Sequence, residues 1–349
     1  MTSQQFYIPT KYAEQAQEFF AYYDMEKVIT CSAVELKTLP NRVCRFCNKT
    51  SISTTFNKAA HTIPELLGNH AWLSDFECDE CNKKFGLEYE SHLAHFLGIS
   101  RTLSGTQGKN KVPDFTSPRY KLTATHDVSG NPYGTVTFTR KNELDDTFSI
   151  DKDTGTTTIK FQSNPYTPLK VYKAFLKMAL SCLPEKYLNA YKLAFEYLMT
   201  DQMDRDCNAF NEISKYSLPQ QYAIEDPVAI LFKKRTSQNN VFTHVFQLFY
   251  GNLIFQFGIP LQIADAYYAT LNNEMMIYTC PPLFFDAQVS ERVNLIDIPF
   301  HICSLSSNDS CKDGWGALQL PIERTLNTRE DGIDYARIKK IEIIRQKPT

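Results

Sequence analysis

The 349-residue sequence lacks any run of about 18 apolar residues, the length a membrane-spanning helix needs. Its first residues, MTSQQFYIPTKY, lack the positively charged flank and apolar stretch of a signal peptide. Internal repeats and low-complexity tracts are also missing. These absences argue against a membrane protein or a secreted protein, and we expect a cytoplasmic location.

The chain also lacks an excess of positive charge. It has 37 Lys and Arg against 39 Asp and Glu, for a net charge of −2. Proteins that bind nucleic acid without sequence preference are usually basic, because neutralising phosphates supplies most of their affinity. Any contact with nucleic acid would therefore depend on local positive charge, or on a partner that presents the substrate.

The composition is that of a folded protein with a sizeable core. Hydrophobic residues make up 43% and charged residues 22%, and there are 24 Phe and 19 Tyr. A chain of this length predicts two domains, or one domain with a large insert.

The ten cysteines do not have the spacing of a secreted disulfide framework. Six are scattered through the chain, and four form two C-x-x-C pairs, Cys44/Cys47 and Cys78/Cys81. Two such pairs predict a tetrahedral zinc site with four sulfur ligands. Because four thiolates leave no open coordination position, this zinc is expected to be structural.

Between the cysteine pairs lie His61 and Pro64 in a His-x-x-Pro pattern, then Gly68-Asn69, and Asn82 directly follows the last cysteine. The combined pattern, C-x-x-C…H-x-x-P-E…G…C-x-x-C-N…G…E over about residues 40–98, resembles the HNH endonuclease family. The resemblance implies two strands and a helix around a metal. A zinc ribbon used only for binding is the alternative, and it would need neither His61 nor Asn82.

The resemblance also implies roles for individual residues. His61 matches the general base, which takes a proton from the water that attacks phosphorus. Neutral imidazole suits this role because its unperturbed pKa is about 6.5. Asn82 matches the residue that reaches the catalytic ion, Mg²⁺ or Mn²⁺, and Asn69 matches the residue that braces the base.

One position departs from the family pattern. Many relatives carry an aspartate before the base as a second metal ligand, and this chain has Ala60. Glu90 is the best replacement, because in a helix over 82–96 it shares a face with Asn82 and Gly86. Glu65 and Glu88 are reserves. If no carboxylate lies close, the domain is a non-cleaving relative.

Several basic residues are candidates for contact with nucleic acid. Lys83 and Lys84 directly follow Asn82 and are well placed to meet a phosphate. The polar segment 101–120 carries Arg101, Lys109 and Lys111, and its composition predicts a solvated connector or, alternatively, a strap across a phosphate backbone. His92 and His95 are expected to be surface or phosphate-contacting side chains, and His70 is a candidate for positioning DNA.

The chain as a whole is predicted to be α+β. The expected parts are an extension over 1–30, an HNH domain with basic linker over 31–112, and a C-terminal α+β domain of mixed helices and strands over 113–349. A helix is predicted over 13–27, and two more over 168–183 and 185–199. The predicted strands span 121–128, 133–141, 147–153, 156–162, 228–235, 241–250, 252–259 and 275–280, with 241–250 in a central position.

The sequence therefore predicts a metal-dependent HNH endonuclease that acts on DNA, with a C-terminal domain that senses, recruits or assembles. This architecture resembles nuclease effectors of bacterial anti-phage systems, by analogy alone. Such an effector would have an activating ligand or partner protein and could be oligomeric. Two alternatives stay open: a non-catalytic zinc module that binds nucleic acid or protein, and a sequence-specific homing or restriction endonuclease.

Overall fold

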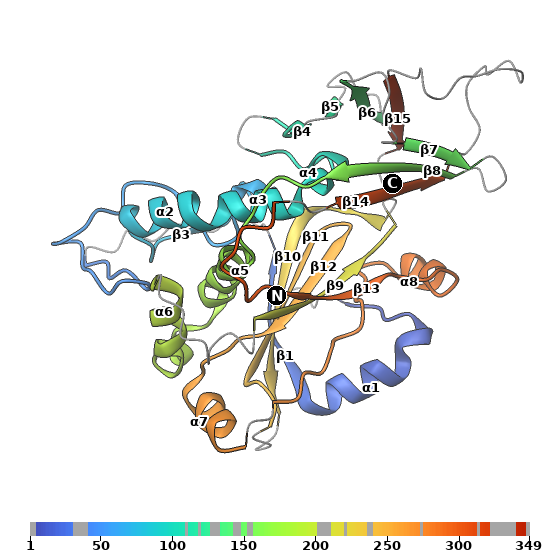
Figure 1. The fold of residues 1–349 in the computed structure, drawn as a ribbon. Coiled ribbons are helices and arrows are strands. Elements are labelled where there is room, and N and C mark those ends of the chain that lie inside the picture. Colours follow the sequence, from blue (N-terminus) through green and yellow to red (C-terminus); the bar gives the residue numbers. More distant parts are fainter. Residues whose placement is uncertain are drawn as a thin grey trace, which may run out of the picture.

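The computed structural model describes residues 5–30, 41–108, 111–117, 120–125, 133–141, 148–151, 156–200, 211–219, 222–235, 240–272, 275–312, 315–321 and 340–346. These residues form one large sheet, smaller sheets, and helices on both faces of the large sheet (Figure 1). The architecture is mixed α and β with antiparallel sheets, as predicted.

The large sheet has six strands in the order β1-β10-β11-β12-β9-β13, and every neighbouring pair is antiparallel. Its strands are β1 (Tyr23–Thr30), β9 (Glu212–Ser217), β10 (Ile224–Lys234), β11 (His244–Gly251), β12 (Leu253–Gly258) and β13 (Phe300–Ser304). All eight residues of β11 are buried. This confirms that the segment 241–250 supplies a central strand.

Strand β1 comes from the N-terminal segment and lies at one edge of the large sheet. It pairs with β10 from Tyr23 opposite Lys234 to Thr30 opposite Val228. The predicted helix over 13–27 is too long: α1 (Ala13–Tyr22) ends where the chain becomes extended against β10. The N-terminal segment thus packs with strands far along the chain. The boundaries at residues 30 and 112 stay predictions.

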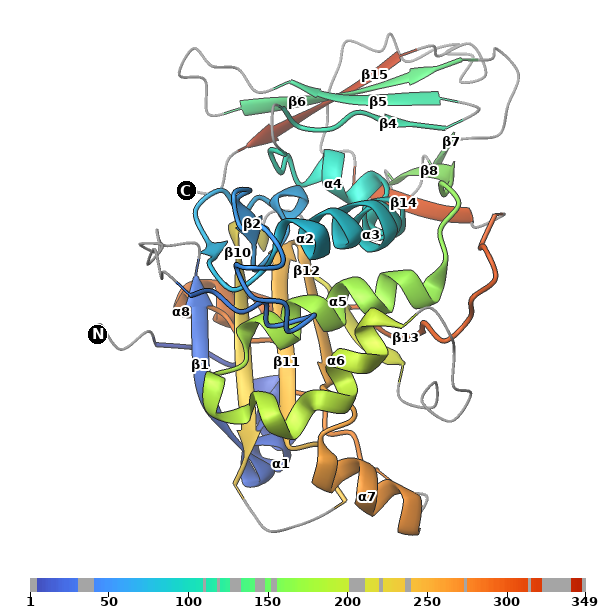
Figure 2. The same cartoon turned by 90° about the vertical axis from the view of Figure 1, so that its left-hand side faces the viewer.

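Helices cover both faces of the large sheet (Figure 2). α5 (Pro168–Cys182) and α6 (Lys192–Met199) lie on one face, and α1 and α8 (Ala287–Val293) lie on the other. Side chains of a strand alternate between faces, so Leu231 of β10 packs with α5 and Ile230 packs with α1. The hydrophobic core therefore has two layers, one on each side of the sheet.

Helix α5 is buried on nearly every side. The residues predicted for its apolar stripe are all buried: Leu169, Tyr172, Leu176, Ala179 and Leu183. Lys173 and Lys177 are buried as well, at 3% and 2% exposure. The sheet covers one side of α5, and the segment with the cysteine pairs covers the other (Figure 2). α5 is thus the layer between them.

The predicted helix over 185–199 is divided. It consists of a 3₁₀ helix, η4 (Glu185–Tyr191), followed by α6. Tyr191, at φ −109° and ψ 16°, is the N-cap of α6 and leaves the helical conformation. Its hydroxyl hydrogen-bonds to Nδ1 of His244 at 2.8 Å in the interior.

The smaller sheets have the strand orders β14-β8-β7, β15-β6-β5-β4 and β2-β3. The strands of the first two are β4 (Phe115–Thr116), β5 (Tyr120–Thr125), β6 (Tyr133–Arg140), β7 (Phe148–Asp151), β8 (Thr156–Gln162), β14 (Trp315–Pro321) and β15 (Lys340–Gln346). The four hairpin strands predicted from alternating residues are confirmed where the structure describes them. Strands β14 and β15 were not predicted from the sequence; they pair with β8 and β6 from far along the chain.

The prediction of a strand over 275–280 is wrong. After α7 (Ile263–Asn272), Met276 makes only an isolated bridge with Val241. The side chain of Gln256 binds this segment instead, accepting from the N–H of Cys280 at 2.9 Å and donating to the carbonyl oxygen of Tyr278 at 3.2 Å. A side chain thus takes the place of a backbone ladder.

In its described part, the start of the polar segment 101–120 is not the solvated connector that its composition predicted. Its start belongs to α4 (Ile99–Leu103), and Ser104 and Thr106 are buried. The Ser104 hydroxyl lies 2.8 Å from that of Thr106 and 3.4 Å from that of Tyr250 in β11. Because these hydroxyls satisfy one another, the polar stretch can pack against the large sheet.

Candidate functional site

The segment with the cysteine pairs folds as two short strands followed by a helix. β2 (Ala60–His61) pairs with β3 (Leu73–Ser74), and η2 (Glu65–Leu67) lies in the loop between them. The helix runs through α2 (Asp79–Phe85), a π-helical turn η3 (Gly86–Glu90) and α3 (Ser91–Leu97). This is the predicted ββα arrangement, and the helix predicted over 82–96 is confirmed.

The four paired cysteines form one cluster. Their sulfur atoms all lie within 4.8 Å of one another, with 3.8 Å between Cys44 and Cys81 and 3.7 Å between Cys47 and Cys78. Zn–S bonds of about 2.3 Å in a tetrahedron separate sulfur atoms by about 3.8 Å. The contact between Cys44 and Cys81 lowers the pKa of Cys44 and raises the pKa of Cys81, so the full set of thiolates that zinc requires depends on binding of the ion itself. The cluster therefore fits the predicted structural zinc.

Asn69 is fully buried and braces the loop between β2 and β3. Its amide nitrogen donates to the carbonyl oxygens of Ile63 at 2.6 Å and Trp72 at 3.0 Å, and its oxygen accepts from the N–H of Trp72 at 2.8 Å. These bonds join the chain just after β2 to Trp72, the residue directly before β3. The contacts have the geometry of a brace, and the catalytic importance of Asn69 stays a prediction.

His61 lies in β2 opposite Leu73, and the residue is partly exposed. Its Nδ1 is buried and has no hydrogen-bond partner among the described residues. Burial is the main cause that lowers the pKa of His61; Glu65 raises this pKa, and Lys177 and His70 lower it. A lowered pKa keeps the imidazole neutral at pH 7, the form that a general base requires.

A buried lysine from α5 reaches the strand that carries His61. The Lys177 ammonium donates to the carbonyl oxygen of His61 at 2.6 Å and lies 3.0 Å from Oε2 of Glu77. The two side chains are 3% and 0% exposed. Neither residue was predicted from the sequence as part of the site. The available signals were a lysine inside the apolar run FLKMALSCL and a glutamate directly before Cys78.

The two predicted ligands of the catalytic ion lie on the long helix. Asn82 is in α2, next to the zinc ligand Cys81, and is partly buried. The prediction that Glu90 shares a helix face with Asn82 assumed a regular α-helix. The chain between them contains the π-helical turn η3, whose wider turn rotates Glu90 relative to Asn82. Burial raises the pKa of Glu90, while Lys177 lowers it and Glu65 raises it further.

The catalytic ion stays a prediction, because the acidic groups of the described residues do not form a cluster that would mark its site. Within the described ranges, the cysteine cluster is the one group of three or more His, Cys, Asp or Glu residues arranged to hold an ion. Of the reserve carboxylates, Glu65 lies 3.7 Å from His70, and Glu88 pairs with Lys84 at 3.0 Å. The oxygen donors of Asn82 and Glu90 suit Mg²⁺ chemically, since this ion prefers hard ligands and keeps several waters.

The predicted nucleic-acid contacts differ in exposure. Lys83 and Lys111 are exposed, and Lys111 lies 3.5 Å from Asp114. Arg101 is turned inward by α4: burial lowers its pKa, and its Nε is buried without a hydrogen-bond partner among the described residues. Lys109 lies outside the described residues. The exposed lysines are therefore the better placed of these candidates for a phosphate.

His92 and His95 both bind backbone groups through Nδ1, and His95 is exposed, as expected for a surface side chain. Nδ1 of His92 accepts from the N–H of Thr167 at 2.9 Å, and Nδ1 of His95 donates to the carbonyl oxygen of Pro165 at 2.8 Å. Both histidines of α3 thus bind the chain just before α5. They fasten the long helix to the start of α5.

Arg45, between the first two cysteines, fastens the same domain to the other end of α5. Its guanidinium stacks on the ring of Phe76 at 3.6 Å and donates to three carbonyl oxygens at the end of α5, those of Leu180, Ser181 and Leu183. Cations are favourable at a helix C-terminus, where carbonyl groups lack partners within the helix.

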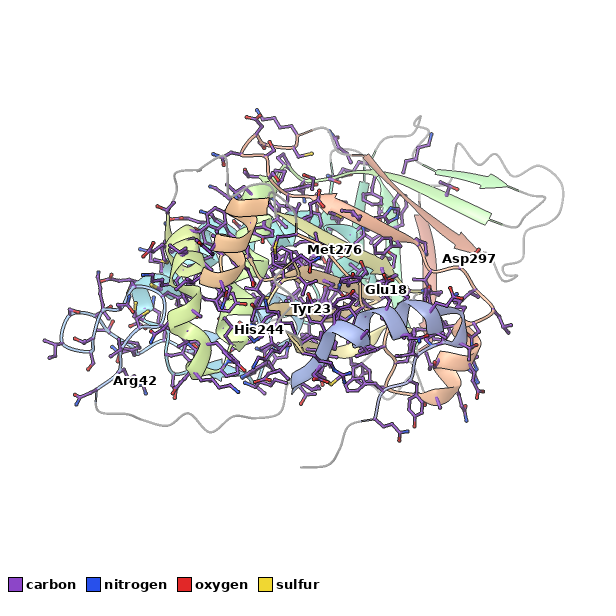
Figure 3. The ribbon with its side chains drawn as sticks, turned by 90° about the horizontal axis from the view of Figure 1, so that it is seen from below. Glu18, Tyr23, Arg42, His244, Met276 and Asp297 are labelled. Carbon is purple, nitrogen blue, oxygen red and sulfur yellow. The ribbon has the colours of Figure 1, made fainter. Side chains whose placement is uncertain are left out.

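Replacing Arg45 by methionine is expected to lower the free energy of unfolding by about 2 kcal/mol, because hydrogen bonds to a charged group are lost and partly buried carbonyls remain. Urea denaturation of the zinc-loaded protein measures this. Arg42→Met is the matched control, since Arg42 (Figure 3) donates to one carbonyl oxygen, that of Phe56 at 3.2 Å. Equal losses in the two variants would contradict the capping role.

Two short strands followed by a helix, a cluster of four sulfur atoms that fits structural zinc, and a histidine on the first strand define a ββα domain of the metal-binding kind. Residues 44–97 match the model of the HNH endonuclease family, so the chain contains an HNH endonuclease domain. The domain supports nuclease activity in general and implies DNA as the substrate. Comparisons with curated proteins and with solved structures find no match.

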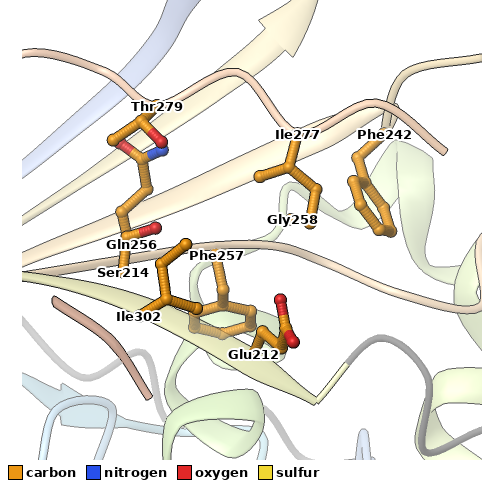
Figure 4. A pocket seen from close by; sticks show the side chains of 9 residues that line it. All are labelled: Glu212, Ser214, Phe242, Gln256, Phe257, Gly258, Ile277, Thr279 and Ile302. Carbon is orange, nitrogen blue, oxygen red and sulfur yellow. The ribbon is translucent and has the colours of Figure 1, made fainter. Parts of the chain in front are cut away.

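The matched residues end before α4, so α5 and the large sheet lie outside the HNH domain. In the part of the chain that the structure describes, no helix has both the length and the apolar character to cross a bilayer. A cavity of about 80 Å³ lies among β9, β12 and β13 (Figure 4), and no residue of the HNH domain lines it. Small-molecule sites measure roughly 300–1,000 Å³, so this cavity is too small for the predicted activating ligand.

Proposed function

We propose that this protein is a metal-dependent endonuclease that hydrolyses phosphodiester bonds of DNA, with His61 as the general base. The supporting observation is the position of His61, a partly exposed histidine with a lowered pKa on the braced hairpin of an HNH domain. The zinc has a structural role, because four thiolates saturate it.

In this proposal the chain's own groups place and deprotonate the attacking water. His61 takes the proton, and Asn69 holds the hairpin that carries it. Asn82 and Glu90 would hold Mg²⁺ or Mn²⁺. When bound, that ion would stabilise the charge on the pentacovalent phosphorus and on the leaving 3′ oxygen. Lys83 follows Asn82 and is exposed, so it can contact a neighbouring phosphate.

The rate of DNA cleavage is expected to fall in acid with a midpoint below about pH 6.5, the ordinary pKa of histidine. His61 acts in its neutral form, and burial lowers its pKa, so protonation stops the reaction only at a more acidic pH. Initial nicking rates between about pH 5 and pH 8 measure this. Glu65→Gln removes a charge that raises this pKa and should move the midpoint lower. A midpoint above that of free histidine would contradict the assignment.

We propose further that the C-terminal part controls the nuclease, as in effectors of anti-phage defence. Two observations support control by another part of the molecule or by a partner. α5 lies directly against the HNH domain, and the net charge of −2 disfavours strong binding to DNA by charge alone. An uncontrolled nuclease would also harm its host.

Cleavage of supercoiled plasmid with Mg²⁺ or Mn²⁺, alone and with candidate nucleotide activators, tests the proposed control. A defence effector is expected to degrade DNA broadly and only after activation. Cleavage at one site without an activator would instead identify a homing or restriction endonuclease.

A non-catalytic zinc module is the second candidate function. Ala60 stands where many relatives have a carboxylate, and no second ligand cluster is present among the described residues. This candidate predicts that the protein binds DNA or a protein without cleaving DNA under any metal. His61→Ala would then leave binding unchanged.

A further inference from the structure

Lys177 contacts three places in the ββα unit, namely β2, the turn before α2 and α2 itself, although it lies far outside the matched segment. Its ammonium donates to the carbonyl oxygen of His61 in β2, pairs with Glu77 beside the zinc ligand Cys78, and lies 5.8 Å from the ring centre of Phe85 in α2. A single cation thus joins the strand of the base, the turn before the zinc ligand and the long helix.

The Lys177 ammonium is buried, so its position is fixed by the groups around it. Lys177 is 2% exposed and sits on a helix held at both ends by the HNH domain, through Arg45 and His92. A buried ammonium is tolerated only where oxygen atoms surround it, and its loss leaves those atoms without a partner. The ammonium therefore has little freedom to move away from the backbone of His61.

We propose that Lys177 is a positioning residue for the reaction: through the carbonyl oxygen of His61 it fixes the strand that presents the base to the substrate. This inference depends on the proposed nuclease function. It means that the nuclease site is completed by a helix outside the HNH domain. Displacement of a reacting group by about 1 Å can cost about 100-fold in rate, so one lost hydrogen bond to this strand can have a large effect.

The test compares three variants of the full-length, zinc-loaded protein. Lys177→Met alone leaves the buried Glu77 without a cation and can fail to fold. Lys177→Met with Glu77→Gln removes both charges, so the fold is retained while the bond to His61 is lost. Glu77→Gln alone keeps that bond, since its amide oxygen can still accept from Lys177.

The double variant is expected to bind zinc and to stay folded, yet to show kcat about 100-fold lower with KM nearly unchanged. Glu77→Gln is expected to keep most of the activity. The acidic midpoint of the double variant should also rise, because Lys177 lowers the pKa of His61, while Glu65 and His70 still face the imidazole. A folded double variant with wild-type kcat and an unchanged midpoint would overturn the proposal.

A second measurement separates this inference from the nuclease proposal. The N–H of Thr62 shares a peptide group with the carbonyl oxygen of His61, so its ¹⁵N chemical shift reports the bond from Lys177. If wild type cleaves no DNA, the nuclease proposal fails. The NMR spectra still test whether Lys177 positions the strand of His61. A changed Thr62 shift and a raised His61 pKa in the double variant support it, and unchanged values overturn it.

Discussion

Replacing His61 by alanine is expected to lower metal-dependent nicking of plasmid DNA by about 10² to 10⁴-fold, the usual contribution of a general base. The imidazole lies on β2, and its burial lowers its pKa, which keeps it in the neutral form at pH 7. The remaining activity would come from binding and from the catalytic ion. Initial rates at saturating DNA, with Mg²⁺ and then Mn²⁺, measure the loss.

The control for this variant is His301→Ala. His301 is exposed on β13, outside the HNH domain, and its replacement is expected to leave the rate unchanged. Zinc content and the thermal midpoint should match wild type in both variants, because the imidazole of His61 makes no hydrogen bond through Nδ1 among the described residues. A zinc-loaded His61→Ala protein that cleaves at the wild-type rate would contradict the assignment of the base.

Replacing Cys78 by serine is expected to remove the zinc and to destabilise the protein by more than about 5 kcal/mol. Structural zinc sites supply apparent binding energies of about 10–16 kcal/mol, and that energy supports folding. Cys78 is fully buried, and its sulfur lies 3.7 Å from that of Cys47. The loss would extend to the contacts of Arg45 and Glu77 with α5, since both residues are adjacent to zinc ligands.

Atomic absorption and thermal unfolding measure these effects. Cys311→Ser is the matched control, because Cys311 is a partly exposed thiol outside the cluster. It should keep its zinc and its thermal midpoint. A chelator added to wild type should reproduce the effect of Cys78→Ser. A Cys78→Ser protein with full zinc and an unchanged midpoint would show that the four sulfur atoms do not hold an ion.

The parts of the site that follow from local spacing could be predicted from the sequence. The C-x-x-C pairs predict the sulfur cage because each turn directs two thiolates to one centre. Asn69 could be identified because its partners, Ile63 and Trp72, are close in the chain. The long helix could be predicted for the same reason, but its π-helical turn at Gly86–Glu90 could not, since ordinary helical periodicity gives no signal for it.

The contacts that join distant segments could not be predicted. The pair Lys177–Glu77 links residues a hundred positions apart, and a lysine in an apolar run gives no indication of its partner. The pairing of β1 with β10 and the burial of Ser104 against Tyr250 likewise depend on the packed sheet. Tertiary packing thus overrides local patterns at these positions.

The presence of a catalytic ion beside His61 is tested most directly by adding Mn²⁺ to the zinc-loaded protein and recording the NMR signals of the His61 ring. Mn²⁺ is paramagnetic and broadens the signals of nearby protons. We predict strong broadening of the His61 ring signals in wild type, and much less in Asn82→Ala and in Glu90→Gln. Signals that stay sharp in wild type, or that broaden equally in all three proteins, would contradict the proposed site.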